Sequence, residues 1–381
     1  MTTITSHSPS YYVRKKFFRH KPAVFGLIII IVAVIVALLG YIILPDGSPN
    51  ANVMSLQLNM LHPMTTVKVL KVPKDHTIPS KGIIETMVSG AESPFYTIPI
   101  NAYTFSHDSI LIDAFTGLNN GKKLLKSFPI QSLIVLDGRT MTLAEQQRQV
   151  VKTCITTKTF ILGSDEFGRD LLSRILIGTR ISLFIGLVAV FISLLIGITM
   201  GAIAGFFRGK VDAVVSWIIN VVWSIPTLLL VIAINMALGK GLWQVFIAVG
   251  LSMWVDVARI VRGQIFVIRE MEYVEASRAL GFTNARIIVK HILPNIMGPV
   301  IVITAANFSS AILLEAGLSF LGMGVQPPMP SWGSMIKEYY GFIVFGEGYL
   351  ALIPGFTIML LVLAFNFVGN GLRDAFETTS E

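Results

Sequence analysis

Six long runs without acidic or basic residues constrain the fold of this sequence more than any other feature. They cover Pro22–Leu44, Ile181–Phe207, Ala213–Gly239, Gly241–Val255, His291–Leu314 and Gly348–Leu372. A helix needs about 20 mainly apolar residues to cross roughly 30 Å of hydrocarbon, so the runs predict six transmembrane helices. The fourth run is the weakest because Asp256 ends it, but 242–258 still suffices if that carboxylate lies near the headgroups.

The composition agrees, because 53% of the residues are hydrophobic and only 14% are charged, too few for an ordinary soluble surface. The basic residues also divide unevenly between the two sides. Segments on the side of the N-terminus hold Arg14, Lys15, Lys16, Arg19, Lys21, Arg208, Lys210, Arg259, Arg262, Arg269, Arg278, Arg286, Lys290 and Arg373, whereas the short loops opposite hold Lys240 and Lys337. This asymmetry predicts cytoplasmic N- and C-termini. We expect the net charge of +8 to reflect it, and expect no nucleic acid partner.

Changes in composition divide the chain into segments. We expect a basic cytoplasmic N-terminus over 1–21, a retained first transmembrane helix over 22–44, an extracytoplasmic inserted domain over 45–160, an interfacial helix over 161–180, helices two to six over 181–376 and a cytoplasmic tail over 377–381. The first apolar run is too long for the core of a cleavable signal peptide, which has roughly 7 to 15 residues. It is therefore expected to remain as an anchor.

The inserted domain is expected to be a small α/β module rather than a disordered linker. Thr66–Val72 alternates weakly like an edge strand, and Gln131–Leu136 is a β-rich run before a turn pair. Thr142 and Glu145 fit a capping box that opens a helix. The following stretch over 163–180 is either a helix along the outer interface or a solvated helix start.

Two features of the later runs concern helix packing. Gly197, Gly201 and Gly205 lie four residues apart, which is the spacing that lets another helix backbone approach closely. Glycine is also common in membrane helices, but two overlapping repeats favour a packing seam. Pro226 removes one helical hydrogen bond and is expected to kink the third span.

The polar stretch between the fourth and fifth runs is sharply punctuated. A helix over about 269–280 is stopped by Gly281, which accepts the left-handed conformation of a helix C-terminus. Thr283 can then cap a second short helix over 284–293, and Pro294 restarts the chain as the fifth span. We expect a compact helix-turn-helix at the inner membrane surface.

With these motifs, the sequence resembles the permeases of binding-protein-dependent ABC importers. The segment EASRALG, with a proline thirteen residues after its glycine, is similar to the E-A-A-x-x-x-G signature of that family. GSDEFGRDLLSRILIGTRISL, WVDVARIVRGQ, HILPN, EAGLSFLGMGVQPP and LAFNFVGNGLRDA are similar to segments of the second, C-type permease subunit of dipeptide, oligopeptide and nickel importers. The resemblance implies an all-α polytopic membrane protein of the type I importer permease fold in the bacterial cytoplasmic membrane.

The resemblance also implies how the chain works. The E-A-A loop, here about 270–285, would be a coupling helix docked in a cleft of a cytoplasmic ATPase subunit. Its contact residues would be Glu275, Ala276, Ser277 and Gly281, with Ala279 and Phe282 packed beside them; Ser277 stands where the family usually has alanine. The implied partners are a second homologous permease, two ATPase subunits, an extracytoplasmic substrate-binding protein and membrane lipid. The chain has no G-x-x-x-x-G-K-[ST] motif, so ATP and Mg are expected on the ATPase subunits and no cofactor on this chain.

Four polar residues within the spans are candidates for the translocation path: Asn220, Asn307, Glu315 and Asn366. For the asparagines we favour the alternative that they hydrogen-bond neighbouring helices, while Glu315 is open between the two. Asp256 is expected to pair with Arg259 or Arg262 at the inner boundary.

Other classes of function fit less well. Ser319 and His291 resemble parts of a serine-protease site, but 28 helical residues place them roughly 42 Å apart. Cys154 is the only cysteine and the six histidines lack metal-ligand spacing, so we expect no disulfide and no metal site. An ATP-independent channel or carrier stays open as an alternative. Within the importer reading, peptides are the first expected substrate, and nickel or metal chelates the second.

Overall fold

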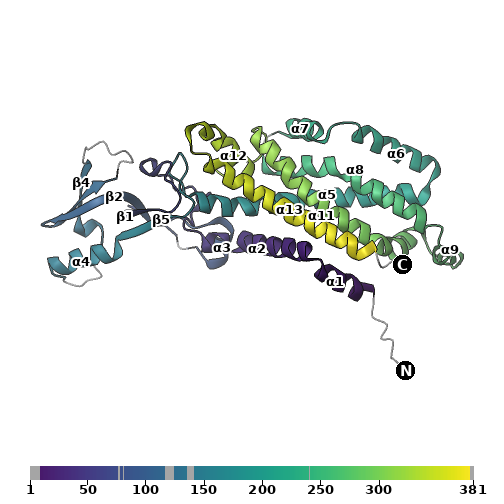
Figure 1. The fold of residues 1–381 in the computed structure, drawn as a ribbon, viewed down its shortest axis with the longest axis horizontal. Helices are drawn as coiled ribbons and strands as arrows, with labels where there is room; N and C mark the ends of the chain where they lie inside the picture. The colour runs from purple at the N-terminus through teal and green to yellow at the C-terminus, as the bar shows by residue number, and fades with distance from the viewer. Residues whose placement is uncertain are drawn as a thin grey trace, which may run out of the picture. The chain divides into compact units, whose positions relative to one another are not determined.

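The structure is a computed structural model that describes residues 9–75, 78–79, 81–115, 124–134, 141–239 and 241–377 (Figure 1). The chain divides into two compact units. One contains Met1–Ile35 and Thr179–Glu381 and is helical, and the other contains Val36–Gly178 and holds the β-sheet. Helices α2 (Lys21–Ile43) and α5 (Leu171–Phe207) each contribute residues to both units.

The helical unit contains most of the apolar sequence. Its further elements are α1 (Pro9–Arg19), α6 (Gly209–Trp223), α7 (Thr227–Leu238), α8 (Leu242–Ile268), α9 (Glu272–Ala279), α10 (Asn284–Arg286), the π-helix η4 (Ile287–Ile292), the 3-10 helix η5 (Leu293–Ile296), α11 (Met297–Phe320), α12 (Trp332–Tyr339), the 3-10 helix η6 (Tyr340–Phe345) and α13 (Tyr349–Glu377). Within the described residues, five helical stretches are long and apolar enough to cross a membrane, and the number is six if α6 and α7 form one span.

The kink that we expected at Pro226 is a complete break. Helix α6 ends at Trp223, α7 begins at Thr227, and the two axes are bent by 93°. Proline has no N–H for the helical ladder, and its ring disfavours helical geometry at the residue before it. The third apolar run is therefore two short helices rather than one bent helix.

The glycine repeat of α5 faces α8. A Cβ atom on Gly197 would lie 2.5 Å from the Cβ of Val257, and one on Gly201 would lie 2.6 Å from the carbonyl oxygen of Ala258. At Gly205 the corresponding distance to the Cβ of Ile265 is 2.9 Å. Each distance is shorter than real Cβ contacts, so only glycine allows this approach of the two backbones.

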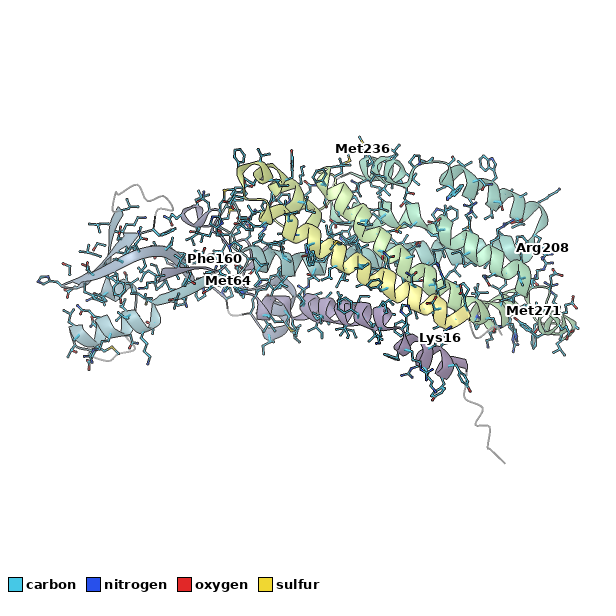
Figure 2. All side chains as sticks on the ribbon, viewed as in Figure 1. Lys16, Met64, Phe160, Arg208, Met236 and Met271 are labelled. Carbon is cyan, nitrogen blue, oxygen red and sulfur yellow. The ribbon has the colours of Figure 1, made fainter. Side chains whose placement is uncertain are left out.

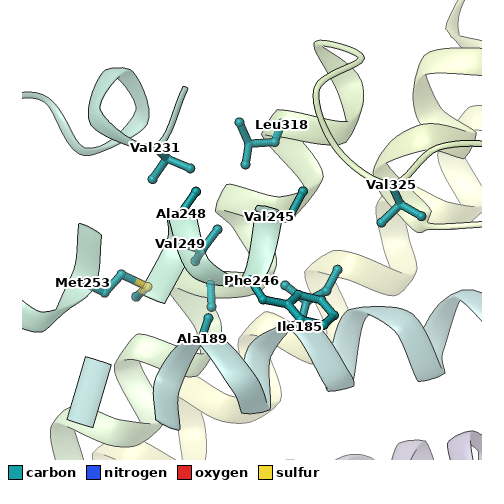
Figure 3. Close-up of a cluster of buried hydrophobic side chains, with 11 residues drawn as sticks. Ile185, Ala189, Val231, Val245, Phe246, Ala248, Val249, Met253, Leu318 and Val325 are labelled. Atoms are coloured by element: carbon teal, nitrogen blue, oxygen red, sulfur yellow. The ribbon is translucent and has the colours of Figure 1, made fainter. Parts of the chain in front are cut away.

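One buried hydrophobic cluster joins several helices of the helical unit (Figure 3). Ile185 and Ala189 of α5 pack with Val231 of α7, and with side chains of α8 that include Phe246. Leu318 of α11 joins the same cluster, so four helices share it. The first run also packs at its start, because Gly26 of α2 lies against the backbone of Ala364 in α13.

The other unit is built on a five-stranded antiparallel sheet with the order β4-β3-β2-β1-β5. Its strands are β1 (Thr65–Pro73), β2 (Phe95–Ser106), β3 (Ser109–Ala114), β4 (Leu124–Pro129) and β5 (Ile155–Phe160), and the short helices are α3 (Ile83–Ser89) and α4 (Leu143–Thr153). Three 3-10 turns, η1 (Pro49–Ala51), η2 (Leu56–Leu58) and η3 (Ile130–Ser132), complete it. One face of the sheet packs on α4 and η3 through Leu70, Ile112 and Val150.

Two of the three local elements predicted for this unit are present. A strand is present over 66–72 as β1, but it pairs with both β2 and β5, so its expected place at an edge of the sheet is wrong. The capping box is present at α4, where Glu145 accepts a hydrogen bond of 2.9 Å from the backbone N–H of Thr142. The strand expected over 131–136 is wrong where the structure describes it, because 130–132 form η3; residues 135 and 136 lie outside the described residues. Leu133 and Ile134 are buried but belong to no strand of the sheet. A short apolar run does not by itself distinguish a strand from a packed turn.

The expected interfacial helix over 161–180 is not a separate element. Residues 161–170 form a turn, and the helix that begins at Leu171 runs through Phe207 as α5. The charges of this turn are also buried rather than solvated. Asp165 contacts the Nε of Arg169 at 2.5 Å and the Nε of Arg174 at 3.7 Å, and all three side chains are at most 5% exposed.

This buried network joins the end of α2 to the start of α5. Asp165 also accepts hydrogen bonds of 2.9 Å from the backbone N–H groups of Phe167 and Arg169. Asp170 accepts from the backbone of Ser173 at 2.8 Å, and the hydroxyl of Ser173 accepts from the backbone of Asp46 at 3.1 Å. A buried charge is tolerated when it is paired and hydrogen-bonded, and Asp165 meets that requirement through partners close to it in sequence. The bond between Asp46 and Ser173 ties the network to a segment 127 residues earlier in the chain.

Candidate functional site

The candidate site is the punctuated segment after α8, which the structure forms as a short helix with a defined stop. Helix α9 ends at Ala279, and Gly281 follows with φ of +76°, in the left-handed region. The N–H of Phe282 donates to the carbonyl of Ser277 at 3.2 Å, and the N–H of Gly281 donates to that of Arg278 at 2.9 Å. This pair of bonds is a Schellman motif, so the predicted glycine stop is confirmed in its geometry.

The second helix begins as predicted but does not end where expected. The hydroxyl of Thr283 accepts a hydrogen bond of 3.4 Å from the N–H of Arg286, which caps α10. The chain then continues through η4 and η5 directly into α11, and the whole stretch over 284–320 is one candidate span. Pro294 lies inside η5, where a tightened turn accommodates its missing N–H, so it does not separate two helices.

Helix α9 has one buried face and one exposed face. Val274 and Ser277 are buried, and the Ser277 hydroxyl donates to the carbonyl of Tyr273 at 2.7 Å. The side chains of Glu275, Ala276 and Ala279 are exposed, as is Gly281. Ser277 therefore points away from the surface that the other motif residues form.

The exposed face includes an apolar residue that the sequence analysis did not select. Leu280 is 73% exposed, although leucine at the end of a helix is ordinarily covered. The signal for it in the sequence is weak, because one leucine in an amphipathic helix is expected to face the core. Exposed Leu280 next to small Ala276 and Ala279 gives the surface an apolar centre with Glu275 beside it.

The side chain of Phe282 packs on the inner side of the turn. Its half-buried ring stacks on His291 with centroids 5.7 Å apart and an angle of 13° between the planes. The guanidinium of Arg286 lies 4.4 Å from the ring centroid on the same aromatic system. These contacts fix the turn between α9 and α10 onto η4. The motif residue Phe282 therefore supports this turn and does not form its outer surface.

Helix α9 rests on the ends of α5 and α8. The guanidinium of Arg278 lies 5.3 Å from the ring centroid of Phe206, the penultimate residue of α5. Arg269 donates to the carbonyl of Phe206, and Arg208 donates to the carbonyl of Phe266 at 3.1 Å. Each arginine thus satisfies a carbonyl in the last turn of the opposite helix, which ties the two ends together.

A further ion pair holds α6 against α8 close to this corner. The carboxylate of Asp212 accepts two hydrogen bonds from Arg262, at 2.5 and 2.7 Å. The expected pairing of Arg262 with Asp256 is therefore wrong, because a bidentate partner fifty residues earlier in the chain occupies that guanidinium. Of the two expected partners of Asp256, Arg259 is the one that interacts with it electrostatically. The guanidinium of Arg259 also lies 4.1 Å from the ring centroid of Trp223. Figure 2 shows Arg208 and Met271 at the same end of the helical unit, where α9 begins.

A hollow of about 900 Å³ lies near α9. It is lined by residues of α8, η5, α11 and α13, with Gln264, Asn295, Arg373 and Glu377 as polar groups. Asn295 also donates to the hydroxyl of Tyr273 at 3.1 Å, so α9 borders this hollow. Most of its remaining lining is apolar.

The four candidate path residues do not form one cluster. Asn307 and Glu315 are buried in α11, whereas Asn220 of α6 and Asn366 of α13 are exposed. The amide of Asn307 donates to the hydroxyl of Ser193 in α5 at 3.3 Å, which is the helix-bridging role that we favoured for the asparagines. Glu315 accepts from the hydroxyl of Ser319 at 2.6 Å.

The sequence analysis missed one buried amide. Asn235 of α7 is 2% exposed, and its amide donates to the backbone carbonyl of Met323 at 2.7 Å. It lies within the third apolar run, where a polar residue is by itself a candidate. It bonds a loop eighty-eight residues later, so the partner was not visible in the local pattern.

Comparison with known proteins places this architecture in a family. Residues 197–379 match the model described as "Binding-protein-dependent transport system inner membrane component", and residues 8–60 match "N-terminal TM domain of oligopeptide transport permease C". The oligopeptide transport system permease protein OppC of Bacillus subtilis is 41% identical over 215 residues, which are 56% of this chain and 70% of that protein. The chain belongs to this family. It is a multi-pass protein of the inner membrane and a transport subunit.

Other relatives have related names. The dipeptide transport system permease protein DppC of Alkalihalophilus pseudofirmus is 43% identical over 56% of this chain and 70% of its own length. The glutathione transport system permease protein GsiD of Pectobacterium atrosepticum is 40% identical over 57% of this chain and 71% of its own length. A solved structure of the MetNI methionine ABC transporter aligns with a TM-score of 0.44 and 23% identity, over 54% of this chain and 96% of that one.

Proposed function

We propose that this family member is the C-type permease subunit of an ABC importer that carries dipeptides or oligopeptides into the cell. The observation that carries the substrate class is the agreement among the relatives. Their names specify oligopeptides, dipeptides and glutathione, which is itself a tripeptide. Nickel or metal chelates are the second substrate class, and an ATP-independent channel or carrier is the alternative mechanism.

The proposed membrane arrangement has six spans, with α6 and α7 together forming the third and both termini in the cytoplasm. Residues 45–160 would then lie outside the cell and α9 inside it. The uneven distribution of basic residues supports this orientation. A second homologous permease would complete the passage, and a substrate-binding protein would deliver the peptide from outside.

Helix α9 is the proposed contact with a cytoplasmic ATPase subunit. Its exposed face supports this role, because small Ala276 and Ala279 permit close approach, Leu280 offers an apolar anchor and Glu275 a charged contact. Ser277, which we first placed in the contact, is better explained as an internal support because it is buried. ATP and Mg would bind on the two ATPase subunits, and this chain would hold no cofactor.

The contacts beneath α9 support a mechanism for force transmission. Arg269 and Arg208 connect the ends of α5 and α8. Arg278 lies over the ring of Phe206, the residue whose carbonyl Arg269 binds, so displacement of α9 would carry both helices with it. Closure of the ATPase subunits on ATP would move α9 and favour an outward-open permease pair. ATP binding shifts that equilibrium only as far as the two states differ in their contacts with the ATPase.

The test of coupling is peptide uptake by the complete complex in proteoliposomes with ATP inside. Glu275→Ala is expected to lower ATP-driven uptake about tenfold without loss of assembly, because a hydrogen bond to a charged group is worth roughly 1.5–3 kcal/mol. Glu272→Ala is the control, since it removes the same charge from the same first turn but lies outside the motif. Equal uptake by Glu275→Ala and the wild type would remove the coupling role.

The same proteoliposomes test the substrate class. Unlabelled dipeptides and oligopeptides should compete with a labelled peptide and stimulate ATP hydrolysis, while nickel should do neither. Stimulation by nickel or a nickel chelate alone would transfer the assignment to the second class. Peptide flux without ATP through the isolated chain would instead support a channel or carrier.

A further inference from the structure

Exposed apolar side chains gather around the point where α2 ends. Helix α2 keeps apolar residues exposed to its last turn, with Ile42 and Ile43 more than half exposed. Two later segments add to these: α3 exposes Ile83, Ile84 and Val88, at 76%, 79% and 66%, and the segment at the start of η2 exposes Met54 and Leu56. We call Ile83, Ile84 and Val88 of α3 the apolar collar.

Hydrogen bonds and close packing fix α3 beside the end of α2 (Figure 1). Gly90, which follows α3, lies so close to Tyr41 of α2 that a Cβ atom on it would be 2.8 Å from the tyrosine ring. The next residue, Ala91, donates its N–H to the carbonyl of Gly47 at 3.0 Å. The ammonium group of Lys81 reaches across α3 to the carbonyl of Gly90 at 3.0 Å. Helix α3 is therefore held at the level where α2 leaves its apolar run.

The second segment is tied to the same place. The carboxylate of Asp46 accepts hydrogen bonds from the N–H groups of Ser48 and Val53, at 3.0 and 3.1 Å. The N–H of Asn50 donates to the hydroxyl of Tyr41 at 3.0 Å. Residues 41–47 thus organise both segments whose apolar side chains stay uncovered. Because α2 spans the bilayer, its end marks the boundary between hydrocarbon and headgroups.

We propose that α3 is an interfacial helix whose apolar collar inserts into the lipid leaflet where α2 ends. The occupant is lipid because the collar continues the lipid-exposed surface of α2, of which only 17% is buried within the chain. Isoleucine and valine on one side of a short helix are the residues that bury into the boundary between headgroups and acyl chains.

This insertion gives the sheet unit a third membrane contact besides α2 and α5. A second permease subunit or a binding protein is the competing occupant of the same surface. The inference does not depend on peptides as the substrate, nor on which side of the membrane the sheet unit lies. Its test therefore gives an answer even if the proposed function fails.

The experiment places an environment-sensitive fluorophore on α3 in the complete complex. Cys154 is buried, and Cys154→Ser removes it as a labelling site. Ile84→Cys in that background carries the label, with Leu125→Cys as the control, because Leu125 is a comparably exposed apolar residue on β4 at the far edge of the sheet. The complex is reconstituted into vesicles of phosphatidylethanolamine and phosphatidylglycerol, with or without brominated acyl chains.

The label on α3 is expected to emit at shorter wavelength than the control and to lose at least half of its emission to brominated lipid. Depth-dependent quenching should place it about 15 Å from the bilayer centre, which is half of the hydrocarbon thickness. A label on α3 that is no more quenched than the control overturns the proposal. A photocrosslinker at position 84 distinguishes the occupants: adducts with lipid support insertion, and adducts with a protein subunit in place of lipid overturn it.

Discussion

At the scale of single residues, the glycines of α5 decide how closely two membrane helices approach. In lipid, helices gain little from the hydrophobic effect between them, so association depends on close packing. A Cβ atom added to Gly201 would lie 2.6 Å from the Ala258 carbonyl oxygen and 2.8 Å from the Cβ of Val261, which is closer than real Cβ atoms approach. By contrast, Gly263 on α8 has open space where its Cβ would be, among the described residues. The two positions differ in surroundings but not in residue type.

Gly201→Ala is therefore expected to destabilise the protein by about 1–3 kcal/mol, because an added methyl group must displace α8. Gly263→Ala is expected to be neutral or slightly stabilising, since alanine is a better helix former by about 1 kcal/mol. The measurement is the temperature at which purified protein loses its monodisperse peak in gel filtration. A lower temperature for both variants would attribute the loss to helix composition and not to the seam.

Asp165 is the residue on which the buried network after β5 depends. It is fully buried and accepts hydrogen bonds from two backbone groups and from Arg169. Removing its charge takes away the carboxylate that the buried Arg169 and Arg174 both contact, so Asp165→Asn is expected to cost about 3–5 kcal/mol. Glu92→Gln breaks the exposed pair with Lys74 and is expected to cost at most about 1 kcal/mol.

Cys154 provides the readout for this comparison, because it is the only cysteine and lies in the core of the sheet unit. A dye that reacts with thiols gains fluorescence when that core opens on heating. Asp165→Asn should lower the midpoint of this transition well below that of Glu92→Gln. Equal midpoints for the two variants would show that the buried network adds nothing to the stability of the unit.

At the scale of elements, helix α4 shows how one cap responds to pH. The hydrogen bond from the backbone of Thr142, followed by that from its hydroxyl, holds the pKa of Glu145 below its ordinary value of 4.5. A carboxylate with a lowered pKa in the folded state stabilises fully above its unfolded pKa. That contribution is lost as the pH falls through the folded value.

The first turn of α4 should therefore lose protection from hydrogen exchange as the pH is lowered below about 4.5, once intrinsic exchange rates are divided out. In Glu145→Gln the protection should be weaker at neutral pH and should change little over the same range. A variant whose pH profile matches the wild type would exclude Glu145 as the titrating group. Peptide-level exchange over 141–150 provides the measurement.

The same elements show what could be predicted from the sequence. The Gly281 stop, the Thr283 cap and the capping box of α4 are interactions within a few residues, so local patterns specify them. The partners of Arg262 and Asn235 lie fifty and eighty-eight residues away, and only the fold brings them together. Burial of Asp165 and Arg174 depends in the same way on the return of α5 beside the end of α2. Leu280 was missed for the opposite reason. The local pattern of the helix predicts that this leucine is buried, whereas the fold leaves it exposed.

At the scale of the whole molecule, the chain joins a helical unit to a sheet unit, and the family match is concentrated in the helical part. The model of the transport family begins at residue 197, and the model of the N-terminal domain ends at residue 60. Strands β1 to β5 lie between the two matched regions. The sheet thus lies outside the residues that the two family models match, and we predict that it receives the substrate-binding protein.

The sheet can be removed because the segments that lead into and out of it lie next to each other. Thr65 is the register partner of Phe160, and the N–H of Met64 donates to the carbonyl of Ile161 at 3.2 Å. Figure 2 shows Met64 beside Phe160. Two glycines can therefore join Met64 to Ile161 in place of 65–160, with Leu58→Ser in the same variant because Leu58 loses its packing on Phe160.

The shortened protein is expected to assemble with its ATPase subunits and to keep basal ATP hydrolysis, because α9 and its supports lie wholly in the helical unit. Stimulation of hydrolysis by the binding protein should fall several-fold, since its docking surface would be missing. A full-length control carries the same two glycines between His107 and Asp108, at the turn joining β2 and β3, and should respond like the wild type. Undiminished stimulation of the shortened protein would mean that the binding protein docks outside residues 65–160, and would contradict the prediction.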